Sequence, residues 1–141
     1  MRIGLISVLS GVLLWAAAPG AANADVLVNV DKSRQRMEVS VDGQPRYSWP
    51  VSTGVASYDT PGGSYRPFRM ERTHFSKEWD DAPMPFAMFF SGGEAVHYSP
   101  DFAAHGYAGS SHGCVNLRDH DAVAALFDEV ELGDGVVVYW S

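Results

Sequence analysis

Short stretches with an apolar residue at every second position constrain the fold of this chain more than any other feature. Valine occupies alternate positions in residues 26–31, and residues 37–41 show the same alternation of apolar and polar side chains. A period of two is typical of a strand with one buried face, whereas a helix repeats every 3.6 residues. Asp42-Gly43 follows, a dipeptide that favours a tight hairpin turn. The segment therefore predicts strand, strand, turn and a third strand at about 47–52.

The rest of the chain continues this pattern with a single helical interruption. Further strands are expected at residues 65–71, 86–90, 94–97 and 136–140. Turn-rich or irregular stretches are expected at 57–64, 73–85 and 99–110. A helix is expected at 121–130, with Asp119 or Asp121 as its N-cap. Neither an internal repeat nor an interdomain linker is visible, so the sequence predicts one mostly-β domain with one principal helix.

Residues 1–24 have the features of a secretory signal peptide. Arg2 supplies a positive start, residues 3–18 are apolar and uncharged, and Ala22-Asn23-Ala24 is a small-x-small cleavage site. A membrane anchor is the alternative, but the apolar run is shorter than the roughly 20 residues that a span requires. We therefore expect cleavage, a mature chain of residues 25–141, no membrane span after cleavage, and export to the periplasm or cell wall.

The charge of the mature chain excludes some partners. Without Arg2, nine of the 10 basic side chains remain against 17 acidic ones, a formal charge of −8. Proteins that bind nucleic acid need a basic face to meet the phosphates. We therefore expect no nucleic acid partner, and the sequence offers no basic patch for an anionic membrane surface.

The cysteine count points to chemistry at one position. Exported proteins usually pair their cysteines as disulfides, but this chain has one cysteine, Cys114. An unpaired thiol outside the cytoplasm is open to oxidation, so it is either buried and inert or kept for reaction. The neighbours His112 and Gly113 do not belong in an ordinary buried strand. We therefore predict that Cys114 is a nucleophile.

A thiol nucleophile needs a base, and three histidines lie close enough in the sequence to be candidates. An imidazole can accept the thiol proton and form a thiolate–imidazolium pair. His112 is two residues away, but Gly113 suggests a tight turn between them. His97 ends an expected strand 17 residues upstream, which lets the chain fold back. We rank His97 above His112 and regard His105 as a loop residue.

Gly113 suggests where the site stabilises the negative charge that develops on a carbonyl oxygen under attack. A residue without a Cβ lets the backbone approach a bound carbonyl and adopt unusual φ angles. The N–H groups of Gly113 and Cys114 then become candidates for an oxyanion hole. A zinc site is the competing interpretation, with ligands drawn from His97, His105, His112 and Cys114. Their spacing matches no zinc motif that we know, so no metal is expected.

The segment Ser111-His112-Gly113-Cys114-Val115-Asn116-Leu117, with an upstream histidine, resembles the signature of the L,D-transpeptidase catalytic domain, also called the YkuD-type domain. Ala95-Val96-His97 is similar to the strand-end histidine of that family. The resemblance extends over residues 26–140 and includes the helix and the last valine-rich strand. One departure is that Tyr98 stands where many members have glycine.

The resemblance implies a fold and a set of roles. The fold would be a β-sandwich of mixed sheets with one principal helix. Cys114 would be the acylated nucleophile, His97 the base, and the Tyr98 carbonyl the group that orients the imidazole. The residues that form the oxyanion environment or shape the site would be Ser111, His112, Gly113, Cys114 and Asn116. Neither a metal nor another cofactor is implied.

The resemblance also implies a reaction. The family attacks a diaminoacyl–D-alanine bond in a peptidoglycan stem peptide, releases D-alanine, and passes the acyl group to an amine acceptor. This would place the chain in peptidoglycan biosynthesis and control of cell shape, with covalent inhibition by carbapenem-type β-lactams. Two alternatives remain open. In the first, the same thiol serves a hydrolase, an L,D-carboxypeptidase or amidase. In the second, the chain is a non-catalytic wall-binding module.

Overall fold

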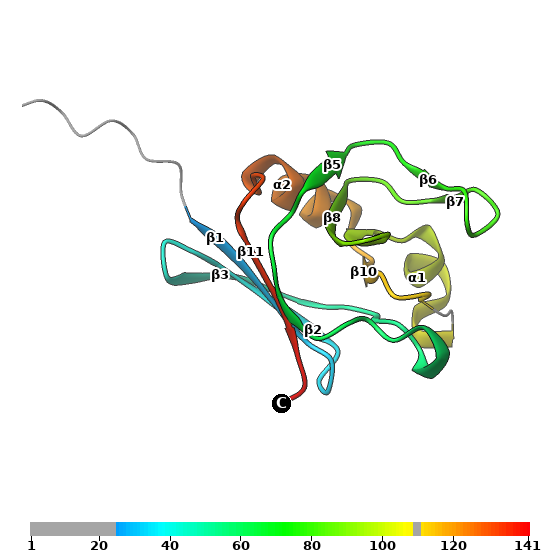
Figure 1. Ribbon diagram of the computed structural model, residues 1–141, viewed down its shortest axis with the longest axis horizontal. Coiled ribbons are helices and arrows are strands. Elements are labelled where there is room, and N and C mark those ends of the chain that lie inside the picture. Colours follow the sequence, from blue (N-terminus) through cyan, green and yellow to red (C-terminus); the bar gives the residue numbers. More distant parts are fainter. Residues whose placement is uncertain (1–24, 109–110) are drawn as a thin grey trace, which may run out of the picture.

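The computed structural model describes residues 25–108 and 111–141 (Figure 1). The predicted signal peptide falls on residues 1–24, which lie outside the described residues. Two mixed sheets dominate the described part, together with a short β6–β7 hairpin. The fold is therefore mostly β, as the alternating sequence pattern predicts.

The first sheet has the strand order β3-β2-β1-β11-β4. Its strands are β1 (Val26–Asp31), β2 (Arg36–Val41), β3 (Gln44–Pro50), β4 (Gly63–Tyr65) and β11 (Gly135–Tyr139). The turn between β2 and β3 is at Asp42-Gly43, both with positive φ, as the hairpin prediction requires. β1 and β11 run parallel, and the other neighbours run antiparallel. The two ends of the domain thus meet at the centre of this sheet.

The second sheet has the order β10-β9-β8-β5 and carries the sequence signature. Its strands are β5 (Arg69–Glu71), β8 (Ala87–Ser91), β9 (Glu94–Tyr98) and β10 (Val115–Leu117). β9 and β10 are parallel, while β8 pairs antiparallel with both β5 and β9. The hairpin β6 (Phe75–Ser76) and β7 (Ala82–Pro83) projects beyond this sheet.

The predicted principal helix is α2 (His120–Glu129). Its N-cap is Asp119, whose carboxylate accepts the Ala122 N–H at 3.1 Å. A second, shorter helix, α1 (Pro100–His105), occupies part of the stretch that we expected to be irregular. Ser99 caps it, and proline at its first position is compatible with a helix start. Single 3₁₀ turns, η1 (Ala56–Tyr58) and η2 (Gly106–Ala108), complete the elements.

The core lies between the two sheets and α2. It combines valines of β1 with apolar side chains of β8 and α2, including Val30, Met88 and Leu126, each at most 2% exposed. Burying one face of each sheet against the other is what makes the period-two pattern energetically favourable. The predicted β-sandwich of mixed sheets with one principal helix is confirmed.

One strand prediction was wrong. Residues 65–71 are not one strand: β4 ends at Tyr65 in the first sheet, and β5 begins at Arg69 in the second. Pro67 lies between them, and proline has no N–H to donate to a continuous ladder. The chain therefore crosses from one sheet to the other here.

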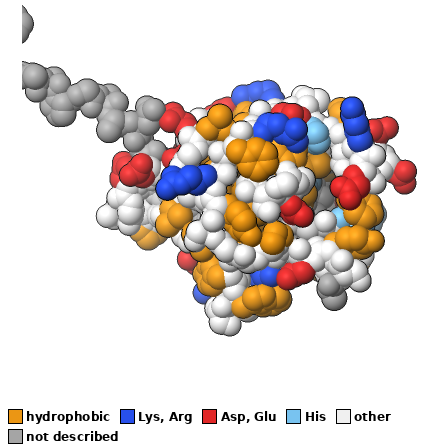
Figure 2. Space-filling model, in the orientation of Figure 1, with side chains coloured by type: hydrophobic (Ala, Val, Ile, Leu, Met, Phe, Trp, Pro, Cys, Tyr) orange, Lys and Arg blue, Asp and Glu red, His pale blue; other side chains and the backbone are white. Residues whose placement is uncertain are grey.

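On the face shown in Figure 2, Lys and Arg side chains lie among acidic and apolar ones rather than in a continuous basic stripe. Within the described residues, no helix is both long enough and apolar enough to cross a membrane.

Candidate active site

The parallel pairing of β9 with β10 brings the distant parts of the signature together. His97 in β9 and Asn116 in β10 are register partners, and Cys114 immediately precedes β10. Side chains of register partners lie on the same face of a sheet. The pairing of β9 with β10 therefore fixes His97 and Asn116 close together, and Cys114 lies two residues before Asn116 on the same chain segment.

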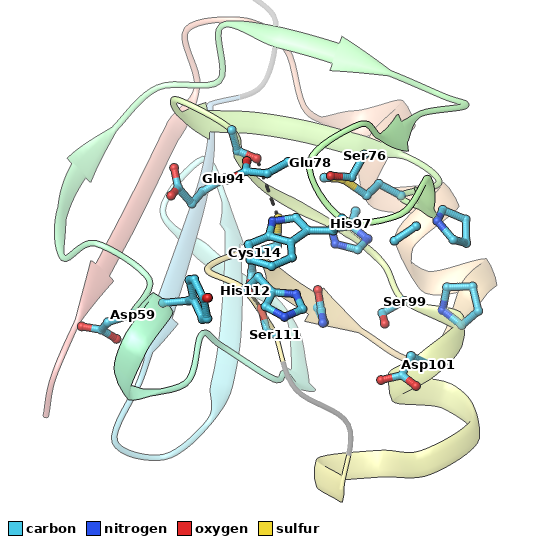
Figure 3. Close-up of a pocket in the computed structure, with 18 residues that line it drawn as sticks. Asp59, Ser76, Glu78, Glu94, His97, Ser99, Asp101, Ser111, His112 and Cys114 are labelled. Carbon is cyan, nitrogen blue, oxygen red and sulfur yellow. Dashed lines mark hydrogen bonds between the residues drawn. The ribbon is translucent and has the colours of Figure 1, made fainter.

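These residues line a pocket of about 500 Å³. The lining includes Tyr58, Trp79, Glu78, Glu94, His97, Asp101, Ser111, His112, Cys114 and Asn116. In Figure 3, Cys114, His97 and His112 lie toward the middle of the labelled residues, with Glu78 and Glu94 on one side and Asp101 on the other. A pocket of this size admits a peptide end or a small ligand.

His97 is held in one orientation by the backbone. Its ring is buried, at 6% exposure, and its Nδ1 lies 2.6 Å from the Tyr98 carbonyl oxygen. A carbonyl only accepts, so Nδ1 carries the hydrogen and Nε2 keeps a lone pair. Burial lowers the pKa of His97 to about 4, the Tyr98 hydrogen bond partly opposes this, and nearby His74 adds to it. At neutral pH the ring is therefore an uncharged base.

The thiol of Cys114 is also uncharged at neutral pH. Burial raises its pKa to about 11; the hydrogen bond from the Ala95 N–H opposes this, and the carboxylates of Glu94 and Glu78 reinforce it. The Ala95 N–H lies 3.4 Å from Sγ, and Sγ donates to the Gly93 carbonyl at 3.9 Å. The resting pair is thus thiol and imidazole, and not the thiolate–imidazolium pair considered from the sequence.

The turn before Cys114 needs glycine. Gly113 has a φ of 114°, and a Cβ there would lie 3.2 Å from Cγ of Glu94. The Gly113 carbonyl accepts from Thr60 Oγ1 at 2.8 Å, and the Cys114 carbonyl accepts from Ser111 Oγ at 2.6 Å. Side-chain hydroxyls therefore hold two successive carbonyls of the signature.

His112 has a different environment from His97. It is exposed, and its ring stacks on Trp79 with 3.8 Å between ring centroids and 6° between planes. Tyr58 contacts both rings edge-on, at centroid distances of 5.3 Å to His112 and 5.1 Å to Trp79. Three loops therefore meet in an aromatic cluster of Tyr58, Trp79 and His112 at the pocket.

Asn116 is anchored by its backbone and leaves part of its side chain unused. Its N–H and carbonyl exchange hydrogen bonds with Ser52 at 2.9 and 3.0 Å. The side chain lines the pocket, and its buried Oδ1 has no hydrogen-bond partner among the described residues. An unsatisfied buried acceptor is costly, so this oxygen is available to a bound N–H donor.

The structure does not assemble the four residues of the zinc interpretation. His105 is exposed, pairs with Asp101 at 2.9 Å, and does not line the pocket that contains His97, His112 and Cys114. No group of three or more potential metal ligands is found within residues 25–108 and 111–141.

Sequence reasoning missed several residues of the site. Thr60, Tyr58 and Trp79 come from stretches that the sequence identified only as loops, and nothing in their local pattern points to the pocket. Gly54 was also missed: a Cβ there would lie 1.9 Å from the Tyr58 carbonyl oxygen and 2.9 Å from Gly113 Cα. Its signal is steric and visible only once the loops are packed.

The fold and the pocket define a class: a mixed β-sandwich with a thiol and a neutral imidazole at one pocket. A family model for the L,D-transpeptidase catalytic domain matches residues 25–138, and the chain belongs to that family. A curated relative, L,D-transpeptidase 1 of Mycobacterium tuberculosis, is 32% identical over 133 residues, covering 84% of this chain and 53% of the relative.

Solved structures support the same family assignment. An L,D-transpeptidase from Stackebrandtia nassauensis superposes with a TM-score of 0.74 at 33% identity, over 84% of this chain and 57% of that one. An L,D-transpeptidase in complex with imipenem superposes with a TM-score of 0.73 at 29% identity, over 82% of this chain and 59% of that one. The chain therefore spans little more than half the length of the relatives that it matches.

Proposed function

We propose that the chain is an L,D-transpeptidase that cross-links peptidoglycan stem peptides through a thioester on Cys114, with His97 as the base. The observation that carries the proposal is the fixed, neutral imidazole of His97 with a free Nε2 lone pair, in the same pocket as the chain's only thiol. Membership of the L,D-transpeptidase family supplies the substrate class.

The first half-reaction forms the acyl-enzyme. Sγ of Cys114 attacks the carbonyl of the diaminoacyl–D-alanine bond while its proton passes to His97 Nε2. Since the resting pKa values keep both groups neutral, proton transfer accompanies the attack rather than preceding it. The carbonyl oxygen gains charge in an environment formed by His112, Gly113 and Cys114. Collapse breaks the C–N bond, and the imidazolium returns the proton to the departing D-alanine amine.

The second half-reaction resolves the thioester. The amine of an acceptor stem peptide attacks the thioester carbonyl and gives a proton to His97. The C–S bond then breaks, and the thiolate receives the proton from the imidazolium. No redox agent is consumed, and His97 and Cys114 return to their starting states. If water takes the place of the amine, the same steps give the L,D-carboxypeptidase or amidase outcome.

Other site residues have supporting roles in this proposal. The Tyr98 carbonyl fixes the imidazole, and Ser111 and Asn116 shape the pocket. Residues 25–141 form the catalytic domain after removal of a signal peptide, and the protein works in the periplasm or cell wall, where it contributes to peptidoglycan biosynthesis and cell shape.

The test uses the mature protein and a Cys114→Ala variant with defined tetrapeptide muropeptides, followed by mass spectrometry. Dimers that have lost one D-alanine support transfer, and tripeptide without dimers supports hydrolysis. The alanine variant should lose activity by about 10⁶-fold, as expected when a covalent nucleophile is removed. Full activity in that variant would rule out the thiol mechanism.

Imipenem gives an independent test of the nucleophile. The structure of a family member in complex with imipenem supports β-lactam binding as a property to examine in this chain. Attack by Cys114 on the β-lactam carbonyl opens the ring, with the thiol proton passing through His97 to the ring nitrogen. We expect one covalent adduct per wild-type chain and none in Cys114→Ala.

A further inference from the structure

Thr60 connects the sequence signature to the first sheet. It is fully buried, at 0% exposure, and lies outside the pocket lining. Its hydroxyl donates to the Gly113 carbonyl at 2.8 Å and accepts the Gly54 N–H at 2.9 Å. One hydroxyl therefore satisfies two backbone groups from two different loops, and it contacts the peptide bond that precedes the nucleophile.

Thr60 is itself anchored. Its carbonyl accepts a hydrogen bond from Lys32 Nζ at 2.7 Å, and the same ammonium pairs with Asp59 at 2.8 Å. Lys32 follows β1, its side chain is almost fully buried, and its Nζ lies 4.5 Å from the centre of the Trp140 ring. Thr60 is therefore held by the rigid sheet rather than by a free loop.

The geometry of a peptide bond gives this contact a consequence. A trans peptide is planar, with its C=O and N–H pointing in opposite directions. The carbonyl of Gly113 and the N–H of Cys114 belong to one such plane. Because the carbonyl points at Thr60 on the buried side, the Cys114 N–H points away from Thr60. Gly113 lacks a Cβ that would restrict rotation of this plane, so an external anchor is needed to hold it.

We propose that Thr60 is a positioning residue for acyl transfer, whose hydroxyl fixes the Gly113–Cys114 peptide so that the Cys114 N–H donates to the oxyanion. Thr60 touches neither substrate nor thiol in this role. The proposal rests on the proposed function and adds the residue that holds its oxyanion donor in place. Donors that are oriented before reaction stabilise developing charge without reorganising, which is the basis of their large contribution to rate.

The test compares two reactions of the same thiol in Thr60→Val. Acylation by imipenem passes through an oxyanion, whereas alkylation by iodoacetamide is a displacement at a saturated carbon and does not. We expect acylation to slow by about 10- to 100-fold, which is less than or equal to the ~10²–10³-fold cost of deleting a donor outright. Alkylation should stay within about twofold of wild type, with an unchanged pH profile, because the His97–Cys114 pair is untouched.

Matched variants separate positioning from general loosening. Thr60→Ser keeps the hydroxyl and should restore acylation to within a fewfold of wild type. Thr53→Val also removes a buried threonine hydroxyl, one that accepts from Gln35 at 2.6 Å and has no bond to Gly113. It should leave both reactions unchanged. Thr60→Ala is a second hydroxyl-free variant in case valine prevents folding, and its acylation must fall as well.

Several results would overturn the role of Thr60. Wild-type acylation in a folded Thr60→Val or Thr60→Ala protein is one, and an equal loss of acylation and alkylation is another. An equal loss in Thr53→Val would show a general effect of removing a hydroxyl. If the wild-type protein neither reacts with imipenem nor turns over muropeptides, the proposed function itself fails, and this result is distinguishable because it appears before any Thr60 variant is made.

Discussion

The two sides of the pocket are built in different ways. The strand side carries His97, Cys114 and Asn116 on or beside the parallel pair β9 and β10. Strand pairing fixes His97 and Asn116, and the Ser111 hydroxyl holds the Cys114 carbonyl. The loop side carries Tyr58, Trp79 and His112, which hold one another through ring contacts. On the strand side, burial shifts the pKa values of His97 and Cys114, whereas His112 on the loop side is exposed.

This difference indicates a division of labour. Proton transfer requires distances and tautomers that hold within a few tenths of an ångström, and a hydrogen-bonded strand pair supplies that precision. Recognition of a peptide tolerates small movements, and stacked rings at the ends of loops can adjust to a ligand. We therefore expect changes on the strand side to alter the rate constant of chemistry, and changes on the loop side to alter substrate binding.

Replacing one histidine on each side of the pocket tests this difference with the largest expected effect. His97→Gln should lower the acylation rate by about 10²–10⁴-fold, the usual contribution of a general base. His112→Gln should lower it by less than about tenfold, because we assign that ring no proton transfer and the oxyanion donors that we propose are backbone N–H groups, which the substitution leaves in place. Single-turnover reaction with imipenem, followed by mass spectrometry, measures both.

A pH profile of Cys114 alkylation checks that the effect arises from proton transfer. In His97→Gln the pH profile of the alkylation rate should shift towards that of a free thiol. In His112→Gln the profile should match that of the wild type. Equal losses in the two variants would remove the distinction between the two sides and the assignment of His97 as the base.

The strand side could be predicted from the sequence because its signals are local. The alternating valines of β1 predict a strand, and the Ser111–Asn116 segment predicts the chemistry of the site. The preference for His97 over His112 rested on the strand end, and the register of β9 with β10 is consistent with it. The catalytic roles themselves remain predictions.

The loop side could not be predicted, for a physical reason. Trp79 lies 33 residues before His112 in sequence, and Thr60 lies 53 before Gly113. Their contacts depend on how irregular loops pack, and irregular backbone has no periodicity to read. The pKa values also needed the structure, because burial and not the identity of neighbouring residues is their largest cause.

The burial of His97 predicts a dependence of stability on pH. Its pKa in the folded protein is about 4, below the ordinary value of 6.5, so the unfolded chain binds the proton more readily between these values. The folded state therefore loses stability as pH falls from about 6.5 towards 4, by up to about 3 kcal/mol.

His97→Gln isolates this contribution, because glutamine does not titrate and its side-chain amide can still donate to the Tyr98 carbonyl. Urea unfolding at pH 7.5 and pH 4.5 should show wild type losing about 2–3 kcal/mol more than the variant. Parallel losses in the two proteins would mean that the ring is not buried in its neutral form.

Trp79 tests the loop side. Trp79→Ala removes the stack on His112, and aromatic pairs of this kind contribute about 0.5–1.5 kcal/mol. We expect KM for a muropeptide donor to rise by about 2- to 12-fold with kcat little changed, and Trp79→Phe to retain most of the binding. A fall in kcat with constant KM would instead place Trp79 with the chemistry and contradict the division between the two sides.

The smallest expected effect concerns the carboxylates at the thiol. Burial is the largest cause of the raised pKa of Cys114. The hydrogen bond from Ala95 lowers that pKa, and the carboxylate of Glu94 raises it. Glu94→Gln should therefore lower that pKa and speed alkylation by iodoacetamide at pH 8 by about two- to threefold, the size of a water-screened interaction between charges a few ångströms apart. Asp101→Asn is the matched control: Asp101 lines the same pocket but pairs with His105, and its loss should leave the alkylation rate unchanged. Slower alkylation in Glu94→Gln would mean that the carboxylate aids deprotonation of the thiol, which would add the first residue of β9 to the proton-transfer machinery of the strand side.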